Sequence, residues 1–210
     1  MGRWYLVRHG QTDSNAEGRL QGHTDTNLNA EGRRQAEALA ARLAPISFAA
    51  AYTSDLSRTR ETAGAILDGR SGKCESLPDL REASHGAWEG LTYDEARERD
   101  VAAYERLMES GANFLAPFAP GGESVSQLVQ RVDRARKRIA EAHGADDDLL
   151  IVAHSGSVRG LLIGLLDLPI EAFWRFRPMP GSLSIVTVSE GMAVAELWNG
   201  TAHLGASHAG

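Results

Sequence analysis

A run of five apolar residues, Leu149–Ala153, constrains the fold of this chain more than any other feature, and His154 follows it directly. A strand that is apolar at every position has to be covered on both faces, which is typical of a parallel sheet packed between two layers of helices. The shorter run Trp4–Val7 has the same character and is followed, after one arginine, by His9. We therefore expect two central strands, each of which ends at a histidine.

Segments with helical periodicity separate the strand candidates. The clearest one covers 124–142, where Ser124 is a good N-cap and apolar residues recur three or four positions apart. The other expected elements are helices at 29–43 (with Asn29 as N-cap), 55–67 and 156–166, a strand at 49–52, and a C-terminal hairpin of 184–189 and 193–198. This alternation predicts an α/β fold, a three-layer sandwich with a mostly parallel central sheet flanked by helices. The polar, helical stretch 92–121 would form a small helical lid on a single domain of residues 1–210.

The charge of the chain excludes some classes of partner. Its 210 residues include 22 lysines and arginines against 28 aspartates and glutamates, which gives a formal net charge of −6. A general nucleic-acid binder or a protein that docks on anionic membranes needs a broad basic surface, so we expect neither partner. A small anionic ligand stays compatible with this charge, because a few arginines in one pocket outweigh the net charge locally.

The single cysteine, Cys74, excludes an internal disulfide framework and a cysteine-based metal site. A reducing compartment is the simplest setting for such a chain. The apolar run near the N-terminus is too short for a signal peptide, and no apolar stretch is long enough to span a membrane. We therefore expect a soluble, cytoplasmic protein.

The two histidines that follow central strands are the first candidates for chemistry. Ligands of an α/β sheet bind beyond the carboxyl ends of its strands, so His9 and His154 can converge on one point. Arg8 precedes His9, and Arg58 lies shortly after another strand candidate. Guanidinium groups bind phosphate oxygens through paired hydrogen bonds, and an imidazole can attack phosphorus. A metal site is the competing interpretation, but it needs three or four ligands, and the neighbouring arginines would repel a cation.

The segment Leu6-Val7-Arg8-His9-Gly10-Gln11-Thr12 resembles the signature of the histidine phosphatase superfamily, which has the phosphoglycerate-mutase-like fold. Further motifs of that family follow in the same order: Asn15 with Gly18-Arg19-Leu20-Gln21-Gly22, Ser54-x-Leu56-x-Arg58, Leu80-Arg81-Glu82 ahead of Gly86-Ala87-Trp88-Glu89-Gly90, Pro120-Gly121-Gly122-Glu123-Ser124, and Val152-Ala153-His154-Ser155-Gly156. Arg-His-Gly alone would be a weak match, but this ordered series covers nearly the whole chain. The chain looks most like the bacterial branch of broad-specificity, α-ribazole-phosphate and metal-independent phosphoserine phosphatases.

The resemblance implies a mechanism without metal or cofactor. His9 would attack the phosphorus of a small phosphorylated metabolite and form a phosphohistidine. Glu82 would protonate the leaving oxygen and then act as base toward the hydrolytic water. The equatorial oxygens, which carry the charge of the transition state, would be held by four side chains: Arg8, Arg58, Asn15 and His154.

The resemblance also assigns substrate or phosphate contacts to Gln21, Gly22 and Ser155. His85, three residues after Glu82, would donate to a substrate carboxylate, with a solvent-exposed loop histidine as the alternative. The aromatic residues at 173, 174 and 176 are expected to pack under the C-terminal hairpin rather than to surround a ligand: Phe173, Trp174 and Phe176.

Three functions remain open after the resemblance is drawn. A phosphatase is favoured over a phosphoglycerate mutase, because Gln11 stands where mutases carry glutamate and because the stretch 92–120 is short and weakly basic. The third is a non-catalytic module that only binds a phosphorylated ligand. Candidate substrates are phosphoserine, α-ribazole phosphate or a range of phosphomonoesters, and a homodimer stays open as the form of assembly.

Overall fold

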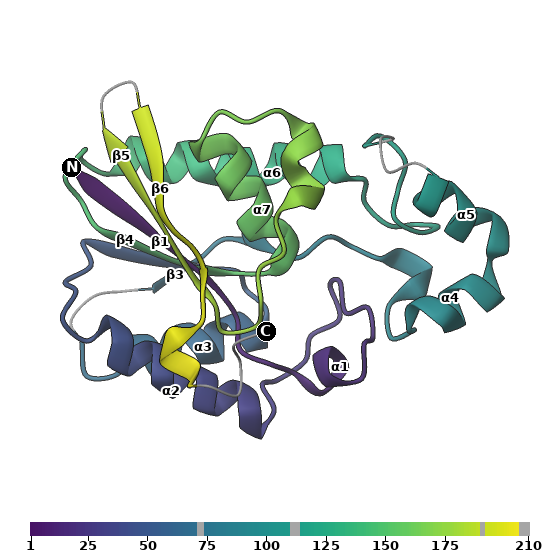
Figure 1. The fold of residues 1–210 in the computed structure, drawn as a ribbon, viewed down its shortest axis with the longest axis horizontal. Coiled ribbons are helices and arrows are strands. Elements are labelled where there is room, and N and C mark those ends of the chain that lie inside the picture. The colour runs from purple at the N-terminus through teal and green to yellow at the C-terminus, as the bar shows by residue number, and fades with distance from the viewer. Residues whose placement is uncertain (71–73, 110–113, 190–191, 206–210) are drawn as a thin grey trace.

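The structure is a computed structural model, and it describes residues 1–70, 74–109, 114–189 and 192–205. Its centre is a six-stranded sheet with the strand order β3-β2-β4-β1-β5-β6 (Figure 1). In that order the strands are Cys74–Ser76, Ala50–Thr53, Leu149–Ala153, Gly2–Arg8, Leu183–Ser189 and Met192–Gly200. The first four strands are mutually parallel, whereas β5 runs antiparallel to both β1 and β6. The predicted α/β sandwich with a mostly parallel sheet is confirmed.

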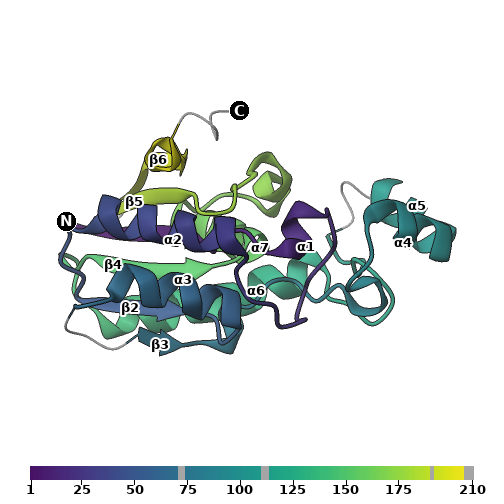
Figure 2. The ribbon, with the colours of Figure 1, turned by 90° about the horizontal axis from the view of Figure 1, so that it is seen from below.

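Helices cover both faces of the sheet, as Figures 1 and 2 show. On one face α2 (Ala30–Leu43) and α3 (Ser57–Leu67) form a core with the even-numbered residues of β4, Leu150 and Val152. On the other face α6 (Val125–Ala142) and α7 (Ser155–Leu165) pack on Leu149, Ile151 and Ala153. All five residues of β4 are buried, because successive side chains of a strand point to opposite faces and both faces are covered.

The capping residues explain where the long helices begin. Asn29 accepts a hydrogen bond from the backbone of Gly32, and Ser124 forms a capping box with Gln127. The predicted start of α3 at residue 55 is wrong by two positions, because the residues before Ser57 form a turn that is part of the candidate site. The described residues also contain four short 3-10 helices: η1 Pro78–Leu80, η2 Gly86–Trp88, η3 Ile170–Arg175 and η4 Ala202–Leu204.

Two elements have no counterpart in the prediction from sequence. The edge strand β3, Cys74–Ser76, has only three residues and lacks a buried one. The helix α1, Asp13–Ala16, is a single turn capped by Thr12. The predicted C-terminal hairpin is confirmed as β5 and β6, and its expected turn at 190–191 lies outside the described residues.

The stretch 92–121 contains α4 (Tyr93–Arg99) and α5 (Val101–Glu109), which extend beyond the carboxyl end of the sheet (Figure 1). Residues of this stretch share a small apolar cluster with two loops of the main body: Leu20, Trp88, Ala96, Ala103 and Ala119. Residues 110–113 lie outside the described part of the chain. Of the helices that the structure describes, none combines the length and the apolar character that a membrane crossing requires.

Candidate active site

The two predicted histidines meet at the carboxyl end of the sheet. β1 and β4 are parallel neighbours with Arg8 paired to Ala153, so the residue after each strand enters the same space. The backbone N–H of His9 donates to the Ala153 carbonyl at 3.0 Å. The rings of His9 and His154 lie edge to face with their centroids 5.1 Å apart. The convergence predicted from the two apolar strands is therefore present.

His9 is held as a neutral imidazole. Its Nδ1 lies 2.7 Å from the Gly10 carbonyl oxygen, and because a carbonyl only accepts, Nδ1 carries the proton and Nε2 carries the lone pair. The ring is almost completely buried. Burial and the positive charges of Arg58 and Arg8 hold the pKa of His9 well below its usual value of 6.5. At neutral pH the ring therefore presents an unprotonated nitrogen between two arginines.

Arg58 is fixed in direction by three acceptors. Its two terminal nitrogens donate to the backbone carbonyls of Gly22 and Thr24, both at 2.9 Å, and its Nε donates to His154 Nδ1 at 3.3 Å. Arg58 is buried, and burial lowers its pKa, yet it forms no ion pair with a carboxylate of the described residues. The guanidinium is thus a buried positive charge beside His9, which suits the binding of an anion.

His154 lies behind Arg58 rather than at the pocket surface. Its Nδ1 accepts from Arg58, and its Nε2 lies 2.7 Å from the Ser54 hydroxyl, which in turn contacts Thr59 at 2.8 Å. Burial, then the charge of Arg58, keeps the pKa of His154 well below 6.5. Both ring nitrogens already have partners, so in this arrangement His154 orients Arg58 and packs against His9.

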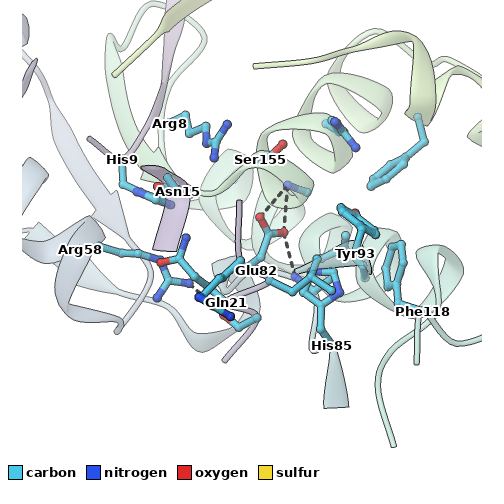
Figure 3. Close-up of a pocket in the computed structure, with 18 of the residues that line it drawn as sticks. Arg8, His9, Asn15, Gln21, Arg58, Glu82, His85, Tyr93, Phe118 and Ser155 are labelled. Carbon is cyan, nitrogen blue, oxygen red and sulfur yellow. Dashed lines mark hydrogen bonds between the residues drawn. The ribbon is translucent and has the colours of Figure 1, made fainter. Parts of the chain in front are cut away.

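Figure 3 shows the pocket that these groups border. Nine of the ten site residues predicted from the sequence line it, and His154 is the one that does not: the nine are Arg8, His9, Asn15, Gln21, Gly22, Arg58, Glu82, His85 and Ser155. Segments far apart in the chain supply them, because the loops after β1, β2 and β4 all open at one end of the sheet. Among the described residues, no three histidine, cysteine, aspartate or glutamate side chains gather into a group that could hold a metal ion.

Glu82 reaches into the pocket from the loop after η1. Its carboxylate accepts from the backbone N–H of Gly156, with the closer oxygen at 2.9 Å, and from the N–H of Ala83 at 2.9 Å. A Cβ on Gly156 would lie 2.3 Å from Glu82 Oε1, so only glycine permits this contact. The carboxyl group is thereby held at the first turn of α7, across the pocket from His9 (Figure 3).

Sequence reasoning missed the pair that fixes the Glu82 loop, Arg131 and Glu123. The buried Arg131 binds both carboxylate oxygens of Glu123, at 2.7 and 2.8 Å, and donates to three carbonyls of the loop, those of Asp79, Arg81 and Glu82. Glu123 also accepts from the Ser84 N–H at 2.9 Å. One signal was present in the sequence: an arginine three residues after Leu128 falls on the apolar face of the helix.

The aromatic residues after α7 correct a second expectation. Phe173 and Trp174 line the pocket, which the expectation did not include, although Phe173 is also buried in the core that contains Val186 of the hairpin. Phe176 does pack on the hairpin, with its ring 5.0 Å from that of Trp198. The alternative for His85, a solvent-exposed loop histidine, is also wrong: its ring lies edge to face with Phe118 at 5.3 Å, and burial lowers its pKa. Two further residues line the pocket, Tyr93 and Arg159, and neither belongs to a motif identified in the sequence.

The sequence profile described as the histidine phosphatase superfamily (branch 1) matches residues 4–201. The chain belongs to this superfamily. It is 32% identical over 200 residues to an adenosylcobalamin/alpha-ribazole phosphatase of Salmonella typhimurium, covering 95% of this chain and 97% of that protein. It is 31% identical over 206 residues to a metal-independent phosphoserine phosphatase of Arabidopsis thaliana, covering 95% and 82% of the two chains.

Solved structures of the superfamily have the same architecture. The crystal structure of a putative alpha-ribazole-5'-P phosphatase from Escherichia coli superimposes with a TM-score of 0.88 at 30% identity, covering 95% of this chain and 96% of that one. The family predicted from the motifs is therefore confirmed, and so is the enzyme class, a phosphatase of the histidine phosphatase type.

Proposed function

We propose that the chain is a metal-independent phosphomonoesterase that hydrolyses a small phosphorylated metabolite through a phosphohistidine on His9. One observation carries the proposal: the neutral His9 ring donates through Nδ1 to Gly10, which leaves the Nε2 lone pair available between Arg8 and Arg58. A nucleophile needs that lone pair, and the phosphoryl oxygens need the two guanidinium groups.

In the first half-reaction, His9 Nε2 attacks the phosphorus while the bond from phosphorus to the ester oxygen breaks. The protonated Glu82 gives its proton to that oxygen, and the alcohol leaves. In the second half-reaction, Glu82 takes a proton from water as the water oxygen attacks the phosphohistidine. The P–N bond breaks, inorganic phosphate leaves, and Glu82 is protonated again, so protons and electrons balance over the cycle.

The other lining residues receive supporting roles in this proposal. Arg8, Arg58 and Asn15 hold the phosphoryl oxygens, and Ser155 adds a contact at the start of α7. Gly22 acts through its carbonyl, which fixes Arg58. The other three predicted residues have two different roles. Gln21 and His85 face the leaving group, whereas His154 orients Arg58.

The setting of the enzyme is part of the same proposal. Relatives are named as phosphatases of alpha-ribazole and of phosphoserine, which supports a small phosphorylated metabolite as the substrate here: phosphoserine, α-ribazole phosphate or a range of phosphomonoesters. We propose that residues 92–121 act as a lid on a single domain of residues 1–210. We also propose a cytoplasmic enzyme, without nucleic-acid or membrane partners, for which a homodimer stays open.

Hydrolysis of p-nitrophenyl phosphate in excess EDTA tests the proposal. The wild type should stay active, and His9→Ala should fall to the background rate. Arg60→Ala is the matched control, because Arg60 is exposed on the helix that carries Arg58 and should leave the rate unchanged. Activity that disappears in EDTA and returns with metal, or that survives His9→Ala, would contradict the mechanism.

The same preparation separates the two alternative functions. A mutase would interconvert 2- and 3-phosphoglycerate in strong dependence on 2,3-bisphosphoglycerate. A binding module would take up phosphomonoesters without turnover. Ranking kcat/KM over L-phosphoserine, 3-phosphoglycerate, α-ribazole 5′-phosphate and sugar phosphates would then select the substrate.

A further inference from the structure

The wall of the pocket beyond Glu82 contains a positively charged side chain, that of Arg159, which the reaction at His9 does not use. Arg159 lies on α7 and lines the same pocket as His9. Its guanidinium forms no hydrogen bond and no ion pair with the residues that the structure describes, and its Nε is completely buried without a partner. A buried donor of this kind is stabilised when a ligand supplies the acceptor.

Aromatic rings fix the direction of this guanidinium. Its central carbon lies 5.2 Å from the ring centroid of Phe173 and 5.4 Å from that of Trp174. The rings are themselves linked edge to face, Phe173 to Trp174 at 5.0 Å and Trp174 to Phe118 at 6.0 Å. Stacking orients the planar fork before any ligand binds, so little side-chain entropy is lost on binding.

The charges that line the pocket do not balance. Among the described residues, four arginines line it, Arg8, Arg19, Arg58 and Arg159, against one carboxylate, that of Glu82. Arg19 is already paired with Glu17 at 2.8 Å and Glu95 at 2.7 Å. Arg8 and Arg58 flank His9 and match the two negative charges of a phosphomonoester, while Glu82 is neutral in its role as acid. Glu82 is the lining carboxylate whose charge acts on Arg159, so while Glu82 carries its proton the charge of Arg159 has no counterpart in the described part of the pocket.

The position of Arg159 relative to Ser155, a proposed phosphoryl contact, indicates how far the missing anion lies from the phosphate group. Arg159 follows Ser155 by four residues in α7, so both lie on one face of the helix, about 6 Å apart along its axis. A small phosphomonoester whose carboxylate is only a few bonds from the ester oxygen is long enough to cover this distance. The fork of an arginine binds a carboxylate through two parallel hydrogen bonds.

We propose that Arg159 is a specificity residue that binds a carboxylate on the leaving group, so that the preferred substrates are phosphomonoesters of small hydroxy acids. This inference rests on the proposed function and names the substrate class of that site. The aromatic rings serve mainly to hold Arg159, and they line the apolar part of the leaving-group space.

A matched pair of substrates tests the inference: 3-phosphoglycerate and glycerol 3-phosphate differ only in the carboxylate, which is a hydroxymethyl group in the second. The wild type should favour 3-phosphoglycerate by about 10- to 100-fold in kcat/KM, the range expected for a hydrogen-bonded charge pair. Arg159→Gln should abolish this preference by raising KM for 3-phosphoglycerate, and Arg159→Lys should restore part of it. Arg175→Gln, an exposed arginine of η3, is the control and should retain the preference.

Two results would overturn the inference: no preference in the wild type, or an equal loss on both substrates in Arg159→Gln. Hydrolysis of p-nitrophenyl phosphate reports on the proposed function separately. If that activity is absent, calorimetric titration of the wild type and Arg159→Gln with 3-phosphoglycerate still measures the contribution of Arg159 to binding.

Discussion

Arg131→Met removes a guanidinium whose five hydrogen bonds hold the loop that carries Glu82. Removing one partner of a buried ion pair costs about 3–5 kcal/mol. The Glu123 side chain keeps 21% of its surface exposed, which favours the lower end of that range. Each kcal/mol lowers Tm by about 2–4 °C in a chain of this size, so we expect Tm to fall by roughly 6–12 °C.

The same substitution should impair the acid step more than the attack by His9. Burial has the largest single effect on the pKa of Glu123 and raises it, but the hydrogen bond and the charge of Arg131, together with the Ser84 N–H, outweigh burial and lower the pKa. Without Arg131 that carboxyl group loses its counter-ion, and the backbone of Glu82 loses its donor. General acid catalysis contributes about 10²–10⁴-fold, so displacing Glu82 should slow an alkyl phosphate at least about tenfold. Hydrolysis of p-nitrophenyl phosphate, whose leaving group needs little protonation, should change much less.

Thermal unfolding and steady-state rates on an alkyl and an aryl phosphate measure the two effects. Arg134→Met is the matched control, because Arg134 lies on the same helix and pairs with Asp79 at the surface. Such an exposed pair contributes about 0–1 kcal/mol. The reasoning is refuted if Arg131→Met lowers Tm no more than Arg134→Met, or if both substrates slow by the same factor.

Three further outcomes follow from the site. Glu82→Gln should slow alkyl phosphates far more than aryl phosphates, and equal losses would remove Glu82 from the acid role. Gly156→Ala should have the same leaving-group signature, because its Cβ would displace the Glu82 carboxylate; Gly64→Ala, on an open helix surface, should leave the rates unchanged. The pKa values of His9 and His154 lie well below 6.5 in the folded state, so the unfolded chain binds protons there that the folded chain does not. Stability should be full above about pH 6.5 and fall below it, and His154→Ala should flatten this slope in thermal unfolding between pH 7 and 5.

The central part of the fold could be predicted because its signals are local. β4 is apolar at every position and is buried at every position, and the caps Asn29 and Ser124 begin their helices as expected. The strand β3 could not be predicted, because one cysteine and two polar residues carry no periodicity and the strand exists only through its pairing with β2.

The candidate site was predictable where residues follow strands and not where they act across the fold. His9 and His154 meet because their strands are parallel neighbours. The sequence indicated two buried strands that end at histidines in a mostly parallel sheet, but not that the two strands are adjacent. Arg131 contacts carbonyls about 50 positions earlier in the chain, and no local pattern encodes that pairing. Whether Trp174 faces the hairpin or the pocket depends on the path of η3, which the composition of the segment does not determine.

Trapping the phosphoenzyme tests the central claim most directly. The protein would be mixed with a radiolabelled phosphomonoester, quenched in alkali within the first turnovers, digested and mapped by mass spectrometry. Phosphohistidine survives alkali and is lost in acid, so we predict label that is stable to base, labile to acid and located on His9. His9→Ala should take up none. Label on another residue, or turnover by the wild type without any labelled protein, would contradict the account.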